Sequence, residues 1–237
     1  MTPKTMKRFY KEATAEQDAS GWSVLLDGRA VKTPAKKTLS VPSQALAEAV
    51  AAEWAAQDDV IDIERMHLTR LVNVALDRVG EQRAGMVDEL VKYCETDLLC
   101  FLAETPADLR ARQIEAWGAV RDWAGQALDI VLMEVPGGVL AAPQPPASLE
   151  AARTYGEGLD DLRLTGVNFG LGLFGSALLS IAVCEGQLSA VEAYERSILD
   201  ELYQAEQWGT DEENEARLTN NRVQASTLDK FFSSFQE

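Results

Sequence analysis

The chain has 237 residues, of which 46% are hydrophobic and 25% charged, the balance of an ordinary globular protein and not of a disordered one. Its net charge of −16 is uneven, because residues 1–40 carry about +4 and the remainder about −20. Binding nucleic acid requires clustered Lys and Arg to neutralise phosphates, so nucleic acid is not the expected ligand. A basic or mixed protein surface is the favoured partner.

Strand-like sequence is confined to the N-terminal part of the chain. Residues 8–11 and 22–29 are predicted strands, and an Asp-Gly turn leads from the second into a third at residues 30–33, as in a β-hairpin. A short fourth run covers residues 38–41. The sequence therefore predicts a small antiparallel sheet.

Helical patterns follow the strands almost without interruption. Ser43 is predicted to cap a helix in which Leu46, Val50 and Trp54 lie four residues apart. A short irregular link with Ile61 and Ile63 follows and is interpreted as the domain boundary. We expect an α+β fold, with a small N-terminal antiparallel-sheet-plus-helix domain (residues 1–63) followed by a larger all-helical domain (residues 64–237).

The helices of the second domain are predicted from apolar positions that recur every three or four residues. Thr105-Pro106 opens a helix that carries Leu109 and Trp117. The Pro- and Gly-rich residues 136–146 are predicted to form a loop. The helices predicted after this loop cover about residues 148–163, 166–185, 189–208 and 211–235.

The helix predicted at 189–208 has a defined start and one apolar stripe. Ser189 and Glu192 have the spacing of a capping box. Gly209 is expected to end this helix in the left-handed conformation, and Asp211 to cap the next one. The residues predicted to form a core-facing stripe are Val191, Tyr194, Ile198, Leu202 and Ala205.

Acidic residues flank this stripe. The helical spacing places Glu206 on one shoulder of the stripe, Glu201 and Trp208 on the other, and Asp200 on the far side. A carboxylate on a shoulder is costly to desolvate unless it gains a cationic partner, in this chain or another. Glu201, Glu206 and Asp211 are therefore the candidate partner-binding acids, while a solvated helix face or a Mg²⁺ site remain the alternatives.

The segment Gly170–Gly175 matches the dinucleotide-binding pattern G-x-G-x-x-G. That fingerprint requires a preceding buried strand, whereas this segment follows helical sequence. Small residues that allow close helix packing are the favoured explanation. A nucleotide- or Mg²⁺-dependent enzyme using these glycines and the acidic helices is the alternative function.

The segment Gly166–Cys184 contains no charged residue. Its length fits a membrane span, but its glycines and Asn168 dilute its hydrophobicity, and no Lys/Arg cluster flanks it closely. We expect one central core helix and no membrane insertion.

No set of catalytic or cofactor-binding residues is evident. His67 is the only histidine, so a histidine-dependent triad or zinc site is unsupported. The three cysteines lack metal-ligand spacing and are expected to be buried free thiols. Without a coiled-coil seam, a monomer is expected.

Taken together, several ordered motifs resemble those of the ATP12 family, the assembly chaperones of the F1 sector of ATP synthase. They extend over nearly the whole chain, and their order is more specific than any one of them. The matching motifs are Arg8-Phe9-Tyr10-Lys11, Leu26-Asp27-Gly28-Arg29, Val31-Lys32-Thr33-Pro34, Glu53-Trp54-x-x-Gln57, Thr96-Asp97-Leu98-Leu99-Cys100, Gln113-x-x-x-Trp117, Gly175-Ser176, and Asp200-Glu201-x-Tyr203-Gln204-x-Glu206-x-Trp208-Gly209-x-Asp211-x-Glu213.

The resemblance implies a non-enzymatic chaperone without a cofactor. It would bind the unassembled F1 α subunit before that subunit meets β, and shield its β-facing surface. Family members are mitochondrial in eukaryotes, and a bacterial member would be cytoplasmic. The acidic motif of the family maps onto Asp200, Glu201, Tyr203, Gln204, Glu206, Trp208 and Asp211, which become the expected partner-binding residues.

Overall fold

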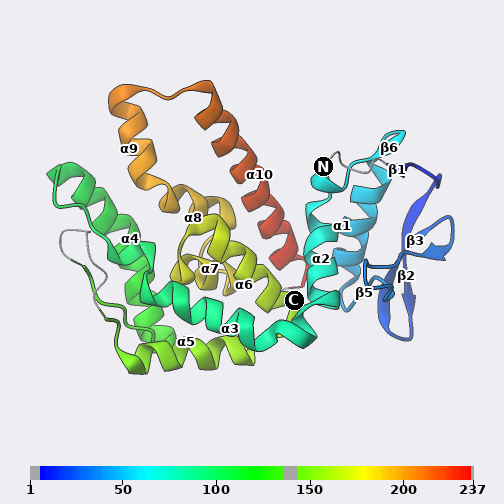
Figure 1. Ribbon diagram of the computed structural model, residues 1–237, viewed down its shortest axis with the longest axis horizontal. Helices are drawn as coiled ribbons and strands as arrows, with labels where there is room; N and C mark the ends of the chain where they lie inside the picture. Colours follow the sequence, from blue (N-terminus) through cyan, green and yellow to red (C-terminus); the bar gives the residue numbers. More distant parts are fainter. Residues whose placement is uncertain (1–5, 136–142, 236–237) are drawn as a thin grey trace. The chain divides into compact units, whose positions relative to one another are not determined.

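The computed structural model describes residues 6–135 and 143–235, and the chain forms two compact units (Figure 1). The first extends to Glu81 and includes the C-terminal residues from Lys230, and the second covers residues 82–229. Among the described residues, all strands precede Glu64 and helices form most of the rest, so the predicted α+β class is confirmed. The domain boundary expected after residue 63 stays a prediction.

The first unit combines short strands with two helices. Its elements are β1 (Met6–Lys7), β2 (Ala13–Asp18), β3 (Gly21–Leu26), β4 (Arg29–Ala30), β5 (Ser40–Val41), α1 (Gln44–Ala55), β6 (Val60–Ile61), the 3-10 turn η1 (Ile63–Arg65) and α2 (His67–Asp77).

The main sheet is antiparallel in the order β2-β3-β4, and β5 also pairs with β3. The predicted hairpin is confirmed, because Leu26 pairs with Arg29 across a turn at Asp27 and Gly28. Both turn residues have positive φ, 48° and 76°, as a two-residue hairpin turn with a right-handed strand twist requires. β1 and β6 form a separate two-stranded sheet.

The predicted and observed strands differ in several places. The strand expected at residues 8–11 is wrong, because β1 ends at Lys7 and Arg8 instead points its guanidinium at backbone carbonyls. The strand expected at 30–33 shortens to β4. β2 was not predicted, since its sequence ATAEQD has no β-branched or aromatic alternation. Pairing with β3 along its whole length stabilises it.

Helix α1 links the sheet to α2. The predicted cap is confirmed, since the Ser43 side chain accepts a hydrogen bond from the N–H of Leu46. On the other side of α1, the Glu53 carboxylate accepts hydrogen bonds of 2.8 Å from the backbone N–H groups of Leu68 and Thr69 and from the Thr69 hydroxyl. Glu53 thus caps α2 from a neighbouring helix.

The second unit is helical throughout its described residues. Its elements are α3 (Val79–Glu95), which begins in the first unit, η2 (Leu98–Cys100), α4 (Ala107–Leu128), α5 (Pro146–Gly158), α6 (Asp161–Phe174), α7 (Ala177–Cys184), α8 (Ala190–Ser197), α9 (Leu199–Trp208) and α10 (Glu212–Ser233), which ends in the first unit. Part of the predicted loop, residues 136–142, lies outside the described residues.

The single core helix expected at 166–185 is wrong. Gly175 adopts a left-handed conformation with φ 65° and ends α6, and the Ser176 side chain caps α7. Both helices are extensively buried, so the expectation of a central position holds although the helix is broken. Among the described residues, no helix is both long and apolar enough to cross a membrane.

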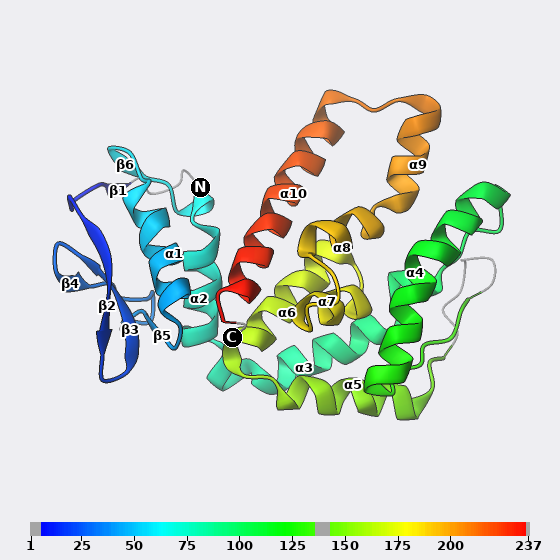
Figure 2. The same ribbon diagram turned by 180° about the vertical axis from the view of Figure 1, so that it is seen from behind.

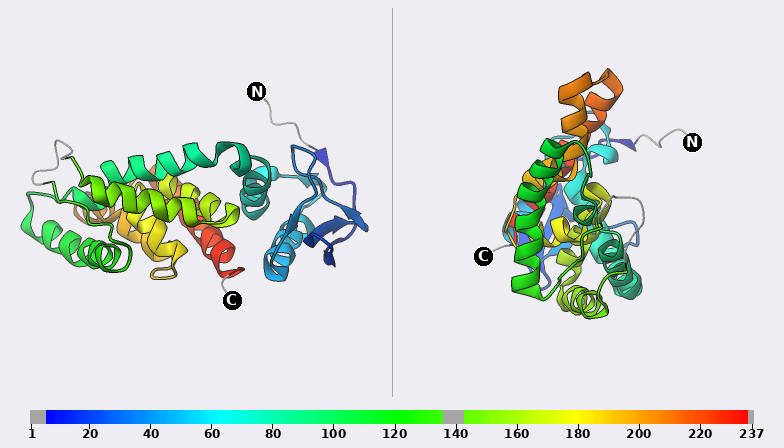
Figure 3. Two further views of the ribbon diagram at one scale, coloured as in Figure 1. Left: turned by 90° about the horizontal axis from the view of Figure 1, so that it is seen from below. Right: turned by 90° about the vertical axis from the view of Figure 1, so that its left-hand side faces the viewer.

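Close helix contacts complete this unit. α3 and α5 run side by side (Figure 3), and a Cβ atom added at Gly156 would lie 3.0 Å from Leu90. In α6, a Cβ atom at Gly170 would lie 2.8 Å from the Ser180 hydroxyl of α7. Glycine is therefore needed at Gly170 for the packing of α6 on α7.

Candidate partner-binding site

The acidic motif lies on α9, and a break separates this helix from α8. The capping box is confirmed, with Ser189 and Glu192 hydrogen-bonded in both directions. The uninterrupted helix expected at 189–208 is wrong, because α8 ends at Ser197 and Ile198 leaves helical geometry with φ −105° and ψ 20°. α9 does not continue the apolar stripe of α8, because Tyr203 is buried while Leu202 is 39% exposed.

Asp200, which is half-buried, and Tyr203, which is buried, both bond to residues of α4. Asp200 Oδ1 accepts a 2.7 Å hydrogen bond from Gln113 Nε2, although the helical spacing had placed it on the far side. The Tyr203 hydroxyl lies 3.0 and 2.9 Å from the two carboxylate oxygens of Asp108 and donates to them. This hydrogen bond raises the pKa of Tyr203. These two residues therefore attach α9 to α4.

Glu201 and Glu206 lie at the surface and are each paired with an arginine of the same chain. Glu201 bonds to Arg217 of α10, and the two side chains are 44% and 48% exposed. Arg112 Nη1 donates to both oxygens of Glu206, at 3.0 and 2.9 Å. Hydrogen bonding to Glu206 raises the pKa of Arg112. Both acids are thus paired but remain accessible.

The end of α9 presents the most exposed aromatic side chain among the described residues. Trp208, expected on a shoulder of the apolar stripe, is 80% exposed. Gly209 has φ 79° but an extended ψ of −176°, and it leads into α10 without the left-handed turn expected there. Asp211 caps α10 as predicted, accepting a 2.8 Å hydrogen bond from the N–H of Asn214. Gln204 is exposed.

A shallow hollow lies in the surface between α4, α8 and α9. Figures 1 and 2 show α9 and α10 running in opposite directions, joined by the short link between them. Beside α9, a hollow of about 320 Å³ is lined by Arg112 and Glu206, the apolar Leu199 and Leu202, and three residues of α8. Apolar and charged groups alternate here, as at the rim of a protein interface. We call the seven residues Asp200, Glu201, Tyr203, Gln204, Glu206, Trp208 and Asp211 the α9 cluster.

The partners of the α9 cluster were not identified from the sequence. Arg112, Asp108 and Arg217 lie on other helices, and no spacing along the chain relates them to α9. The sequence predicts that a partly buried carboxylate needs a cationic partner, but it does not predict which arginine that partner is. The helix packing decides that.

Neither alternative chemistry has a matching geometry. Gly170 and Gly172 lie inside α6, and Gly175 ends it, so the glycine motif does not connect a strand to a helix as phosphate binding requires. Among the described residues, no three His, Cys, Asp or Glu side chains converge in a way that could hold a metal ion.

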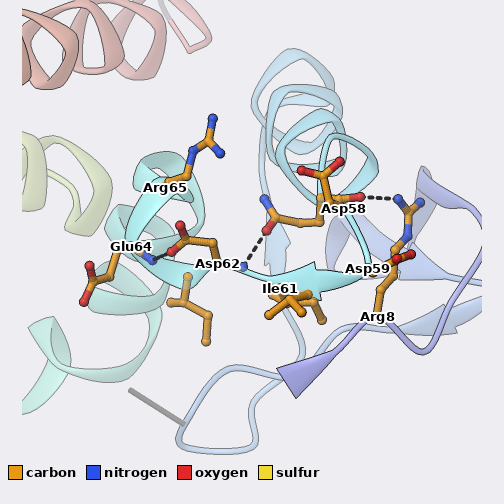
Figure 4. A pocket seen from close by; sticks show the side chains of 10 residues that line it. Arg8, Asp58, Asp59, Ile61, Asp62, Glu64 and Arg65 are labelled. Atoms are coloured by element: carbon orange, nitrogen blue, oxygen red, sulfur yellow. Dashed lines mark hydrogen bonds between the residues drawn. The ribbon is translucent and has the colours of Figure 1, made fainter. Parts of the chain in front are cut away.

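The first unit has a larger polar hollow around β6. It measures about 1050 Å³ and is lined by residues 57–65 and Arg8. Figure 4 shows Asp58 and Asp59 at one end of β6 and Asp62 and Glu64 at the other. Arg8 donates hydrogen bonds to four backbone carbonyls. Arg8 therefore has a structural role, and the acids lie apart at the two ends of β6.

Comparison with known sequences identifies the family. A family model described as ATP12 chaperone protein matches residues 7–125, half of the chain. The chain belongs to the ATP12 chaperone family. The mitochondrial protein atp12 of Schizosaccharomyces pombe is 24% identical over 217 residues, which cover 87% of this chain and 75% of that protein.

Solved ATP12 structures have the same fold. Atp12 from Paracoccus denitrificans is 36% identical, with a TM-score of 0.89 over 97% of this chain and 98% of that one. An aspartate-to-lysine variant of the same protein gives the same values. The Atu1473 protein of Agrobacterium tumefaciens is 35% identical, with a TM-score of 0.90 over 98% of this chain and 87% of that one. The family model includes Asp108 and Arg112 of α4 and ends before α9.

Proposed function

We propose that this chain is an assembly chaperone of the F1 sector of ATP synthase that binds the unassembled α subunit. Membership of the ATP12 chaperone family supports the chaperone activity. The observation that carries the proposal is Trp208, an 80% exposed aromatic side chain on a helix with surface carboxylates. Exposed aromatic groups beside charged ones are typical anchors of protein interfaces.

In this proposal the exposed residues of the α9 cluster cover apolar surface on α that later contacts β. Free α exposes that surface and is prone to aggregate. Trp208 and Leu202 contribute apolar contacts, and Glu201 and Glu206 pair with basic groups of α. Exposed ion pairs stabilise a protein by only about 0.2–1 kcal/mol. Exchange of Arg217 or Arg112 for an arginine of α therefore costs little.

Release follows when β offers α a larger interface. A chaperone that bound α too tightly would block assembly, so the complex is expected to be weak to moderate in affinity. The proposal includes no catalysis. It therefore expects no thermal shift of the purified protein with ATP, NAD or Mg²⁺.

The test compares charge variants of the Glu201–Arg217 pair for binding to purified F1 α subunit. Glu201→Lys is expected to weaken binding about tenfold in titration calorimetry, and to reduce the suppression of α aggregation measured by light scattering. Asp88→Lys is the matched control, because Asp88 of α3 is also a surface acid paired with an arginine of another helix, Arg153 of α5, and it lies outside the hollow beside α9. It is expected to bind α like the wild type.

A double variant separates contact from structure. Glu201→Lys combined with Arg217→Glu restores the ion pair with its charges exchanged. If Glu201 contacts α, the double variant has a normal melting temperature but still binds weakly. Recovery of full binding in the double variant means that Glu201 acts only through α10. Unchanged binding of Glu201→Lys alone would refute the role of this acid.

A further inference from the structure

A second hollow of the first unit has an aromatic lining. It measures about 520 Å³ and is formed by β1, β4, the end of β3 and α1, a volume in the range of ligand-binding pockets. We call it the aromatic groove. The residues that line it are Met6, Phe9, Tyr10, Leu26, Asp27, Arg29, Ala30, Val31, Lys32 and Trp54.

The aromatic side chains of the groove form a fixed series. Phe9 meets Tyr10 edge-on with ring centres 5.4 Å apart, and Tyr10 meets Trp54 at 5.7 Å. The Tyr10 hydroxyl donates a 2.7 Å hydrogen bond to the Trp54 carbonyl, and the Arg8 guanidinium lies 4.8 Å from the Tyr10 ring centre. Tyr10 is therefore held in place, which reduces the entropy lost on binding.

Phe9 is the accessible member of this series. It is 66% exposed, whereas Tyr10 and Trp54 are buried. An aromatic side chain that is positioned by a buried neighbour and yet open to solvent is a ready contact for an apolar group. Tyr10 and Trp54 thus form the buried apolar base of the groove, and Phe9 is its exposed apolar side.

The charged residues of the groove favour an acidic ligand. Asp27 accepts hydrogen bonds from the N–H groups of Lys11 and Glu12. These bonds lower its pKa and stabilise its carboxylate within its own turn. Lys32 donates to the neutral Thr38 hydroxyl at 2.7 Å, and neither Lys32 nor Arg29 is paired with a carboxylate among the described residues. Arg29 and Lys32 outnumber Asp27, so the rim of the groove carries a net positive charge.

Several motifs by which the chain resembles its family converge on this groove, and the α9 cluster uses none of them. They are Arg8-Phe9-Tyr10-Lys11, Leu26-Asp27-Gly28-Arg29, Val31-Lys32-Thr33-Pro34 and Glu53-Trp54-x-x-Gln57. The presence of Tyr10, Leu26 and Trp54 in these motifs is explained by their packing in the core of the first unit. Phe9 and Arg29 are exposed and are not explained in this way.

We infer that the aromatic groove is a second docking site, for a segment of a partner protein that has an apolar or aromatic side chain flanked by acidic residues. The apolar side chain packs on Phe9 and the apolar base of the groove, and its acidic neighbours pair with Arg29 and Lys32. This site is independent of the α9 cluster. Its acidic ligand is opposite in charge to the basic groups proposed to bind α9.

Fluorescence anisotropy with the full chain and a labelled peptide, acetyl-Glu-Asp-Phe-Leu-Asp-Glu, tests the inference. Phe9→Ala and Arg29→Glu are each expected to weaken peptide binding about tenfold. Both residues are exposed, so both variants are expected to fold. The matched controls are Ile63→Ala and Arg70→Glu, which change exposed residues of the same unit outside the groove. They are expected to bind like the wild type.

Two further peptides and one further variant complete the test. Replacing the peptide acids by lysine, or its Phe and Leu by alanine, is expected to abolish binding. Trp208→Ala is expected to leave peptide binding unchanged, and loss of peptide binding in this variant would overturn the independence of the groove from the α9 cluster. Loss of α binding by Trp208→Ala, with peptide binding retained, bears only on the α9 proposal. Equal binding by Phe9→Ala, or by the lysine peptide, overturns the inference. It is also overturned if sedimentation without peptide shows a dimer that Phe9→Ala dissociates, because the groove would then hold a second copy of this chain.

Discussion

At the scale of single residues, Asp97 connects distant parts of the second unit. It is completely buried, and its carboxylate accepts hydrogen bonds from the N–H groups of Leu99 and Leu178, both at 3.0 Å, and from the Ser176 hydroxyl at 2.8 Å. Burial raises the pKa of Asp97, and the hydrogen bonds oppose that rise. A buried carboxylate with only donors around it is compatible with the fold because each donor satisfies it.

Asp97→Asn is therefore expected to lower the free energy of unfolding by about 3 kcal/mol. The amide NH₂ group cannot accept a hydrogen bond, so it leaves at least one buried donor without an acceptor. Urea unfolding followed by circular dichroism measures the change. Asp88→Asn is the control, because Asp88 is exposed and pairs only with the surface residue Arg153, and its unfolding curve should match that of the wild type. Equal curves for both variants would contradict the role of Asp97.

Asp18 predicts a measurable pH dependence. Hydrogen bonds from the side chains of Ser20 and Ser23 and from the N–H of Ser20 lower the pKa of Asp18 to about 2. A carboxylate with a lowered pKa stabilises the folded state above its unfolded pKa of about 4 and loses that contribution as the pH falls to about 2. An NMR titration that follows the carboxyl carbon of Asp18 should have its midpoint at about pH 2. Ser20→Ala should raise it, and a wild-type midpoint near 4 would exclude the hydrogen-bonded turn.

At the scale of elements, helix caps join neighbouring helices. Glu53→Ala removes three hydrogen bonds from the start of α2, and it is expected to lower the free energy of unfolding by about 2 kcal/mol. Glu48→Ala, on the exposed side of α1, is the matched control. Thermal unfolding measures both variants. Equal melting temperatures would show that α2 does not depend on this cap.

The sequence predicts caps and helix starts better than it predicts helix breaks. Ser43, Ser189 and Asp211 cap helices as expected, because a cap needs only residues close in the chain. The breaks at Gly175 and Ile198 were missed, although the Gly175-Ser176 pair contains a local signal for one. At Ile198 we see no such signal, since the apolar spacing continues through it.

Part of the candidate site also could not be predicted from short stretches of the sequence. The acidic residues of α9 are visible in the sequence, but the helix break at Ile198, the burial of Tyr203 and the exposure of Trp208 are not. The pairing of Glu206 with Arg112 joins residues far apart in the chain. Contacts of this kind depend on how helices pack, which the period of a single helix does not determine.

At the scale of the whole molecule, the charge distribution governs association. The net charge is −16, while residues 1–40 are net positive. If acidic residues attract basic groups of α, the association rate constant should fall steeply as NaCl rises from about 0.01 to about 1 M, because the Debye length shortens from about 30 to 3 Å. Stopped-flow fluorescence measures this rate constant.

Trp208→Ala separates the charge effect from the apolar contact. This variant removes buried apolar area from the proposed complex and leaves every charge in place, so its association rate constant should show the wild-type dependence on salt while its dissociation becomes faster. Glu201→Lys should instead weaken the salt dependence. An association rate constant that does not change with salt would contradict electrostatic attraction between the acidic surface and α. Apolar contacts alone would then account for the binding of α.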